Sequence, residues 1–144
     1  MIALDTNLLI YAHRARNPFH RQARSAIAQA CQNPSGCGIA SASVSEFLSV
    51  VTHPRSQDKP STISEATAFL RGLGEDGGVR VWVPGEGFPQ RFLQAVQDLA
   101  VTGVRIFDLQ IALTVLENGA VEIWTHDRDF ISLPGLKKRD PFSN

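Results

Sequence analysis

Short apolar runs alternate along the chain with longer stretches in which apolar positions recur at helical spacing. The short runs have strand length, and each one stops at polar or turn-forming residues. They predict strands at Ile2–Leu4, whose run ends at Asp5, and at Cys37–Ala40, Val79–Val83 and Val121–Trp124, with a short edge strand near Lys137–Arg139.

The amphipathic stretches between these runs predict helices. The first four are expected at Leu8–His13, from the N-cap Asn17 and Pro18 to Ala30, from Ser43 to about Val51, and at Ile63–Leu73, which Gly72 and Gly74 would end. A fifth helix is expected at Phe88–Ala100, with a buried stripe at Phe88, Phe92, Leu93, Val96 and Leu99. A sixth would be opened by Asp108 and closed by Asn118–Gly119.

Strands that alternate with helices are typical of an α/β fold with a parallel sheet covered on both faces. A chain of 144 residues is long enough to bury a full core, and we expect a single domain over residues 1–144. The segment from His53 to Ser61 is rich in turn-forming residues and predicts an exposed loop.

Composition narrows the function classes further. Formal net charge is zero, so no overall basic surface for nucleic acid is expected, although arginines cluster early and basic residues cluster near the end. The chain has no apolar run of membrane-spanning length, and no secretory signal is expected. Its two cysteines, Cys31 and Cys37, favour a reduced cytoplasmic protein, although the sequence leaves a disulfide between them open. The four histidines lack zinc spacing, and no dinucleotide-binding or P-loop glycine motif is present.

Four acids fall at equivalent points of the predicted fold. Asp5 follows the first strand, Glu46 lies in the first turn of the helix after the second, Asp108 opens a helix, and Asp127 follows the strand ending at Trp124. In a parallel sheet these points share one edge, where ligands bind. Carboxylates gathered there repel one another unless a cation joins them, and hard divalent cations prefer oxygen ligands.

Each acid also has a structural alternative. Asp5 can cap the following helix, Ser43 and Glu46 have the spacing of a capping box, Asp108 can be an N-cap, and Asp127 can be a turn residue. Capping and metal binding are compatible in one residue, so the sequence leaves both roles open.

The ordered set of motifs resembles the PIN-domain ribonucleases, and most closely the VapC toxins of bacterial toxin–antitoxin pairs. The resemblance spans nearly the whole chain and rests on the segments Met1–Ala12, Ser43–Phe47, Val104–Ala112, Ile123–Phe130 and Leu133–Leu136. It implies a three-layer α/β/α PIN-like domain whose central, mostly parallel sheet has four or five strands.

The resemblance also implies a site and an activity. Asp5, Glu46, Asp108 and Asp127 would be the catalytic acids that hold Mg²⁺ or Mn²⁺ for hydrolysis of RNA, leaving 5′-phosphate and 3′-hydroxyl ends. The supporting polar residues would be Thr6, Asn7 and Thr125, with Asp129 as an outer structural residue. The implied partners are an RNA substrate, a cognate VapB-type antitoxin and a second copy of the chain in a homodimer, with no membrane.

RNA would have to approach the acids over a basic rim, because phosphate contacts dominate affinity for nucleic acid. The candidate RNA-contacting residues are Arg14, Arg16, Arg55, Lys59 and Arg128. Single-stranded or looped RNA is the expected target, since its splayed bases can be stacked and read.

Two other functions stay open at this point. A phosphatase resembling the haloacid dehalogenase group also has an aspartate after its first strand, but position 7 is Asn7 rather than a second aspartate, and no lysine falls in a convincing place. The third possibility is a domain that binds RNA or a protein partner in an acidic cleft without cleaving it.

Overall fold

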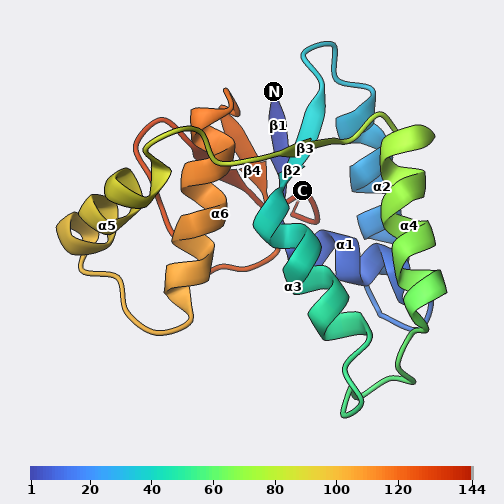
Figure 1. Ribbon diagram of the computed structural model, residues 1–144. Helices are drawn as coiled ribbons and strands as arrows, with labels where there is room; N and C mark the ends of the chain where they lie inside the picture. Colours follow the sequence, from blue (N-terminus) through green and yellow to red (C-terminus); the bar gives the residue numbers. More distant parts are fainter. Residues whose placement is uncertain (144) are drawn as a thin grey trace.

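A computed structural model describes residues 1–143 of the chain. Its centre is a five-stranded sheet in which every neighbouring pair is parallel, in the order β3-β2-β1-β4-β5 (Figure 1). The strands are β1 (Ile2–Leu4), β2 (Cys37–Ala40), β3 (Arg80–Trp82), β4 (Glu122–Trp124) and β5 (Lys137–Arg139). The predicted α/β class and parallel sheet are confirmed.

Six helices flank this sheet in residues 1–143. They are α1 (Thr6–His13), α2 (His20–Cys31), α3 (Ser41–Val51), α4 (Ile63–Glu75), α5 (Phe88–Leu99) and α6 (Arg105–Glu117). In Figure 1, α1, α2 and α4 lie on one side of the sheet and α5 and α6 on the other, which gives the three layers expected. None of these helices is both long enough and apolar enough to cross a bilayer.

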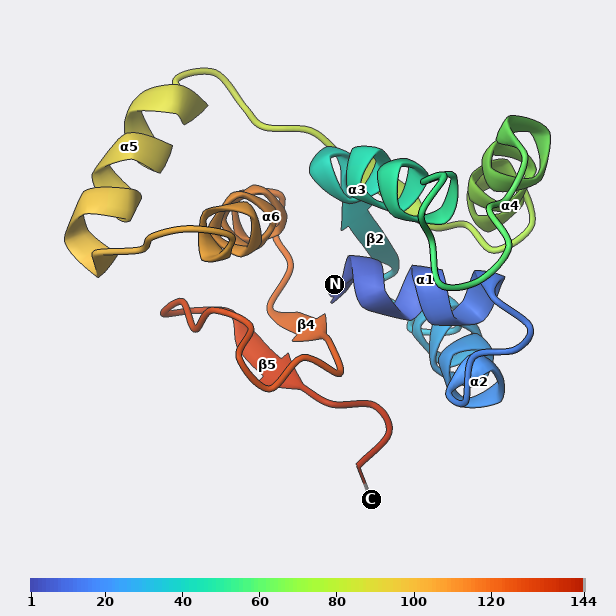
Figure 2. The same ribbon diagram turned by 90° about the horizontal axis from the view of Figure 1, so that it is seen from below.

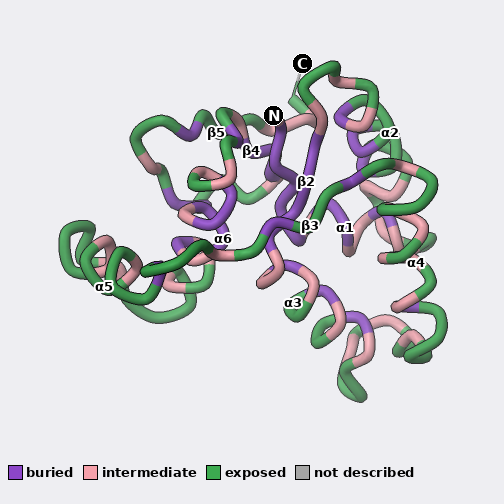
Figure 3. The backbone as a smooth tube through the Cα atoms, turned by 45° about the horizontal axis from the view of Figure 1, so that its top comes forward, coloured by how far each residue is buried: buried purple, intermediate pink, exposed green. Residues whose placement is uncertain are grey.

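Alternation along β1 divides the core between the two faces of the sheet. Ile2 and Leu4 pack into a cluster with residues of α1, α2, α3 and α4, whereas Ala3 joins the cluster built mainly on α6. Successive side chains of a strand point to opposite faces of the sheet, so the three residues of β1 contribute to both core clusters. Figure 3 shows β1 and β2 as buried tubes at the centre of the molecule.

The structure corrects two predicted helix boundaries. Asn17 does not cap α2; its side chain accepts a hydrogen bond from the Phe19 backbone N–H at 2.8 Å and forms a turn, and the helix begins at His20. Gly72 and Gly74 do not end α4, which continues to Glu75. Two glycines with helical φ are tolerated there because the helix is held by packing rather than by propensity alone.

The predicted buried stripe on α5 is also partly wrong. Phe88 is buried, and Phe92 and Val96 pack partly against the core, but Leu93 is 67% exposed and Leu99 is 42% exposed. Figure 2 shows α5 at the periphery, next to α6, so only one narrow strip of its surface has a neighbour. An amphipathic pattern therefore overestimated how much of this helix is covered.

Cys31 and Cys37 are free thiols, as the composition suggested. The Cys37 thiol donates to the Cys31 sulfur at 3.7 Å, and burial raises the pKa of Cys37 to about 12. The buried thiol therefore stays protonated at neutral pH.

All of the parallel strands end at the same edge of the sheet, where α1 and α3 begin directly after β1 and β2. Figure 2 looks at the molecule from this side and shows α1, α3, α6 and β4 around it. The four acids predicted from sequence lie on these elements or directly after them.

Candidate active site

Asp5 is fixed at the start of α1 by two hydrogen bonds. One carboxylate oxygen accepts from the Thr6 backbone N–H at 2.7 Å, which makes Asp5 the N-cap, and the other accepts from the Thr125 hydroxyl at 2.7 Å. Only 6% of the residue is exposed. The pKa of Asp5 is raised to about 7, chiefly by burial and also by the charges of Glu46 and Asp108, against the two hydrogen bonds that lower it.

Glu46 does not belong to a capping box. Helix α3 begins at Ser41 with Ala40 as its N-cap and no side-chain cap, so Ser43 lies inside the first turn. The Glu46 carboxylate instead accepts from the Thr6 hydroxyl at 2.8 Å, across from α1. The structural alternative that explained Glu46 locally is therefore wrong, and its side chain is directed toward the residue next to Asp5.

Asp108 is likewise not an N-cap. Helix α6 begins at Arg105, so Asp108 lies in the first helical turn and its side chain does not cap the helix. The pKa of Asp108 is raised to about 6, first by burial and then by the charges of Asp127 and Glu46, against the opposing charge of Arg105. The early start places a half-buried carboxylate within electrostatic range of two other acids.

The Thr125 hydroxyl connects the segment after β4 to the start of α1. It donates to Asp5, and it accepts from the Asn7 side-chain amide at 3.1 Å and from the Asp127 backbone N–H at 3.0 Å. Asp127 is exposed, and one of its carboxylate oxygens accepts from the Asp129 backbone N–H at 2.8 Å. Asp127 thus keeps a turn role, and Asp129 contributes its backbone rather than its carboxylate.

Replacement of Thr125 by valine should therefore disturb the fold and the site together. Thr125 is buried, and the change would leave three polar groups without their shared partner, which typically costs about 1–3 kcal/mol of unfolding free energy. Loss of the bond to Asp5 should also raise the pKa of that carboxyl further. Urea denaturation and a pH–rate profile test both effects. Thr125→Ser should restore both, and a valine variant with wild-type stability would contradict this role.

Sequence reasoning missed the aromatic residues that support this segment. His126 packs against both Phe19 and Phe142, with ring centroids at 4.5 and 4.8 Å, and its Nδ1 lies 3.0 Å from the Asp140 carboxylate. Tyr11 contacts the same cluster. The only signal in the sequence was the position of His126 between Thr125 and Asp127.

The donor set at this edge fits a hard divalent cation. The four acids supply only oxygen, and the buried side-chain oxygen of Asn7 has no hydrogen-bond partner in residues 1–143. The charges of Glu46 and Asp108 raise the pKa of Asp5, and the charges of Asp127 and Glu46 raise the pKa of Asp108, in each case after the larger effect of burial. In residues 1–143, however, no three His, Cys, Asp or Glu side chains converge closely enough to hold one ion in this conformation.

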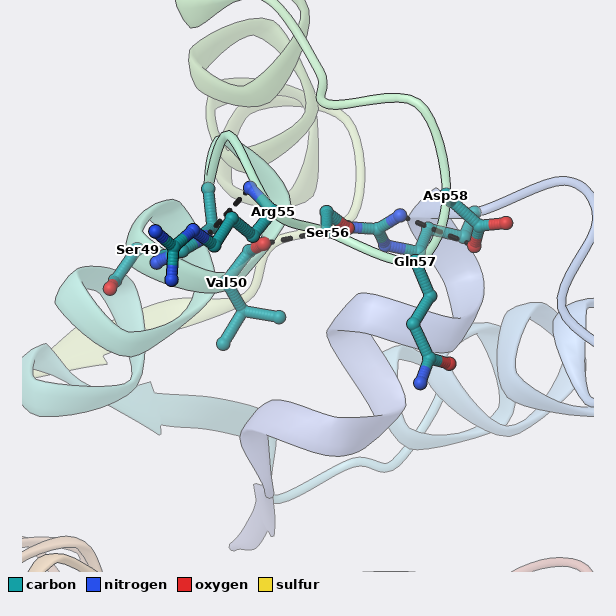
Figure 4. Close-up of a pocket in the computed structure, with 8 residues that line it drawn as sticks. Ser49, Val50, Arg55, Ser56, Gln57 and Asp58 are labelled. Carbon is teal, nitrogen blue, oxygen red and sulfur yellow. Dashed lines mark hydrogen bonds and ion pairs between the residues drawn. The ribbon is translucent and has the colours of Figure 1, made fainter.

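The candidate RNA-contacting residues are not all equally available. Arg14 is only 10% exposed at its side chain; it donates to the Ser56 hydroxyl at 2.7 Å and pairs with Asp58 at 3.2 Å. Arg14 lines a pocket of about 410 Å³ together with residues of the loop after α3. Figure 4 shows the pocket, with dashed lines that reach Val50, Ser56 and Asp58. Arg14 therefore anchors the loop from His53 to Ser61, whereas Arg16, Arg55, Lys59 and Arg128 are exposed.

Comparison with known proteins agrees with this architecture. The family model described as PIN domain matches residues 2–136. Ribonuclease VapC48 of Mycobacterium tuberculosis is 26% identical over 96% of this chain and 96% of its own length, and Ribonuclease VapC43 of the same organism is 28% identical over 98% and 95%.

A solved structure shares the fold. The crystal structure of Mycobacterium tuberculosis VapC20, a Sarcin-Ricin loop cleaving toxin, superposes with a TM-score of 0.68 at 15% sequence identity, covering 90% of this chain and 92% of that one. The family model covers nearly the whole of the described chain, so the protein belongs to the PIN-domain family, and the relatives it resembles are VapC proteins.

Proposed function

We propose that this protein is a VapC-type endoribonuclease that hydrolyses RNA with Mg²⁺ or Mn²⁺ held by Asp5, Glu46, Asp108 and Asp127. The observation that carries the proposal is the buried carboxylate of Asp5, fixed by Thr6 and Thr125 and raised in pKa by burial and by Glu46 and Asp108. A carboxyl group that is costly to ionise in the free protein is well suited to a cation that makes ionisation favourable.

The chain's own residues define how such a site would work. Asp5 is rigid, whereas Glu46 and Asp127 are exposed, so these carboxylates can turn toward a cation that Asp5 positions. A divalent cation bound there supplies Lewis-acid stabilisation of phosphoryl charge and lowers the pKa of water. One of the carboxylates would accept a proton from the attacking water. The Thr125 hydroxyl holds Asp5 and the backbone of Asp127 together, because it donates to the first and accepts from the second.

The family supports the two protein partners of the proposal. The relatives are named VapC ribonucleases, and we propose by analogy a VapB-type antitoxin and a homodimer. The phosphatase alternative loses support, because Asn7 donates to Thr125 and the Lys138 ammonium is bound to the backbone carbonyls of Arg128 and Phe130.

The test is treatment of total RNA with the purified protein in Mg²⁺, in Mn²⁺ and in chelator, followed by mapping of all new ends. We expect a small set of metal-dependent cuts with 5′-phosphate and 3′-hydroxyl ends. A folded protein that binds RNA but leaves it intact in both metals would favour the non-catalytic alternative.

Removal of the exposed rim charges should weaken RNA binding without selecting among sequences. We expect each single neutralisation to make the slope of log RNA affinity against log salt concentration shallower by up to about one. The four residues to neutralise are Arg16, Arg55, Lys59 and Arg128. Arg14→Met, by contrast, should loosen the loop that Arg14 anchors. Fluorescence anisotropy over a salt series separates these effects, and rim variants with the wild-type salt slope would exclude those residues from the RNA path.

A further inference from the structure

A groove of about 400 Å³ lies between α3 and α6, with the Glu46 carboxylate in its lining. Helix α3 contributes Ser45, Glu46 and Val50 to its lining, and α6 contributes Phe107 and Gln110. On α3 the lining positions 42, 45 and 49 recur every three to four residues, as do 107 and 110 on α6, so each helix contributes one continuous strip. Glu46 lines the groove, so the groove borders one of the four proposed catalytic acids. Asp108 follows Phe107 on α6 but does not itself line the groove.

The charge of the groove limits what can occupy it. Its lining contains one carboxylate, Glu46, and no basic residue. A phosphate group or an acidic peptide would be repelled there, because nothing in the lining offsets its charge. The remaining lining is apolar or uncharged, so the groove favours a neutral group with at least one apolar face.

Phe107 supplies such a face. It is 61% exposed, although an aromatic ring at the first turn of α6 could have been covered by α5 or α3. An exposed aromatic ring beside a nucleic-acid site is a platform for base stacking, which needs no particular base. Ordinary core packing does not account for Phe107.

The polar residues of the groove can form hydrogen bonds with the edge of a base. Gln110 carries both a donor and an acceptor, and in residues 1–143 its side-chain amide has no hydrogen-bond partner. Ser45 and Ser49 line the opposite wall. A carboxamide and hydroxyl groups around an aromatic ring can read the edge of an unpaired base.

We infer that the groove between α3 and α6 binds one unpaired nucleobase of the RNA next to the scissile bond, with Phe107 stacking on the base and Gln110 reading its edge. This rests on the proposed function for the identity of the substrate as RNA. The groove would thereby act as a specificity-determining subsite, and paired bases would be unable to enter it.

The test measures binding, so it does not depend on cleavage. In an Asp5→Asn background, short fluorescein-labelled single-stranded homopolymers of A, C, G and U and one labelled RNA duplex are titrated with protein and followed by anisotropy. Phe107→Ala should weaken binding of single strands by about tenfold and leave duplex binding unchanged, whereas Phe107→Tyr should stay within about twofold of the parent. Gln110→Leu should alter the ratio of affinities among the four homopolymers by about fivefold or more.

Leu93→Ala is the matched control, because Leu93 is equally exposed but lies on α5, outside the groove. It should bind all probes as the parent does, and thermal melting should show every variant folded. Wild-type affinity of folded Phe107→Ala and Gln110→Leu for all single strands would overturn the inference, as would an equal loss for the duplex. Single-strand binding that depends on Phe107 in a protein that cuts no RNA would support the subsite and overturn only the nuclease.

Discussion

Replacement of Asp5 by asparagine is expected to lower kcat for RNA cleavage by at least about 10³-fold, since loss of a metal-held carboxylate removes several kcal/mol of transition-state stabilisation. Asparagine keeps an oxygen that can accept from the Thr6 N–H, so α1 should still be capped. The loss should therefore fall on the chemistry and not on the fold. Single-turnover cleavage of a mapped RNA site, with circular dichroism as the folding check, measures it.

Asp76→Asn is the matched control for this prediction. Asp76 is an exposed aspartate at the end of α4, so the same loss of charge there should leave kcat unchanged. Folded Asp5→Asn protein that cuts at the wild-type rate would exclude the acid site as the place of hydrolysis.

The stability of the metal-free protein should fall as pH rises from about 4 to about 7. Burial raises the pKa of Asp5 from 3.8 to about 7, so across this window the folded state holds a proton that the unfolded chain has lost. A state that binds more protons is favoured at low pH, and the full cost, at most about 4 kcal/mol, is present above the folded pKa. Asp108, with a pKa raised to about 6, changes stability in the same direction but by less, because it is partly solvated.

Two comparisons test this prediction. In chelator at about pH 8, Asp5→Asn should be more stable than the wild type, whereas at about pH 4 the difference should vanish. Added Mn²⁺ should raise the melting temperature of the wild type at about pH 8 and have little effect on Asp5→Asn, because a ligand stabilises only a state that binds it. Stability that is independent of pH and of Mn²⁺ would mean that Asp5 is not a costly buried acid.

The sequence was informative wherever a feature depends on chain order alone. Ile2–Leu4 followed by Asp5 predicted both β1 and the placement of its acid, because parallel strands end at a shared edge. Lys137–Arg139 was correctly expected as an edge strand. These features follow from local pattern and from the geometry of parallel sheets.

Features that depend on packing between distant segments were harder to predict from the sequence. Ser43 and Asp108 have the residue types of helix caps, yet α3 and α6 begin at Ser41 and Arg105, so both residues lie inside the first helical turn. Arg14 looked like a free surface charge, but the loop with Ser56 and Asp58 folds over it. The groove that Phe107 and Gln110 share with α3 joins segments about sixty residues apart, so no local pattern predicts it.

The most direct test of the central claim is the rate of cleavage of one mapped RNA site as Mn²⁺ is added back to chelated protein. We expect no cleavage in chelator, a rate that rises and saturates with Mn²⁺ in the wild type, and a flat response in Asp5→Asn. Cleavage by the wild type in full chelation, or a saturating Mn²⁺ response in Asp5→Asn at the wild-type rate, would contradict a metal-dependent ribonuclease built on these four acids.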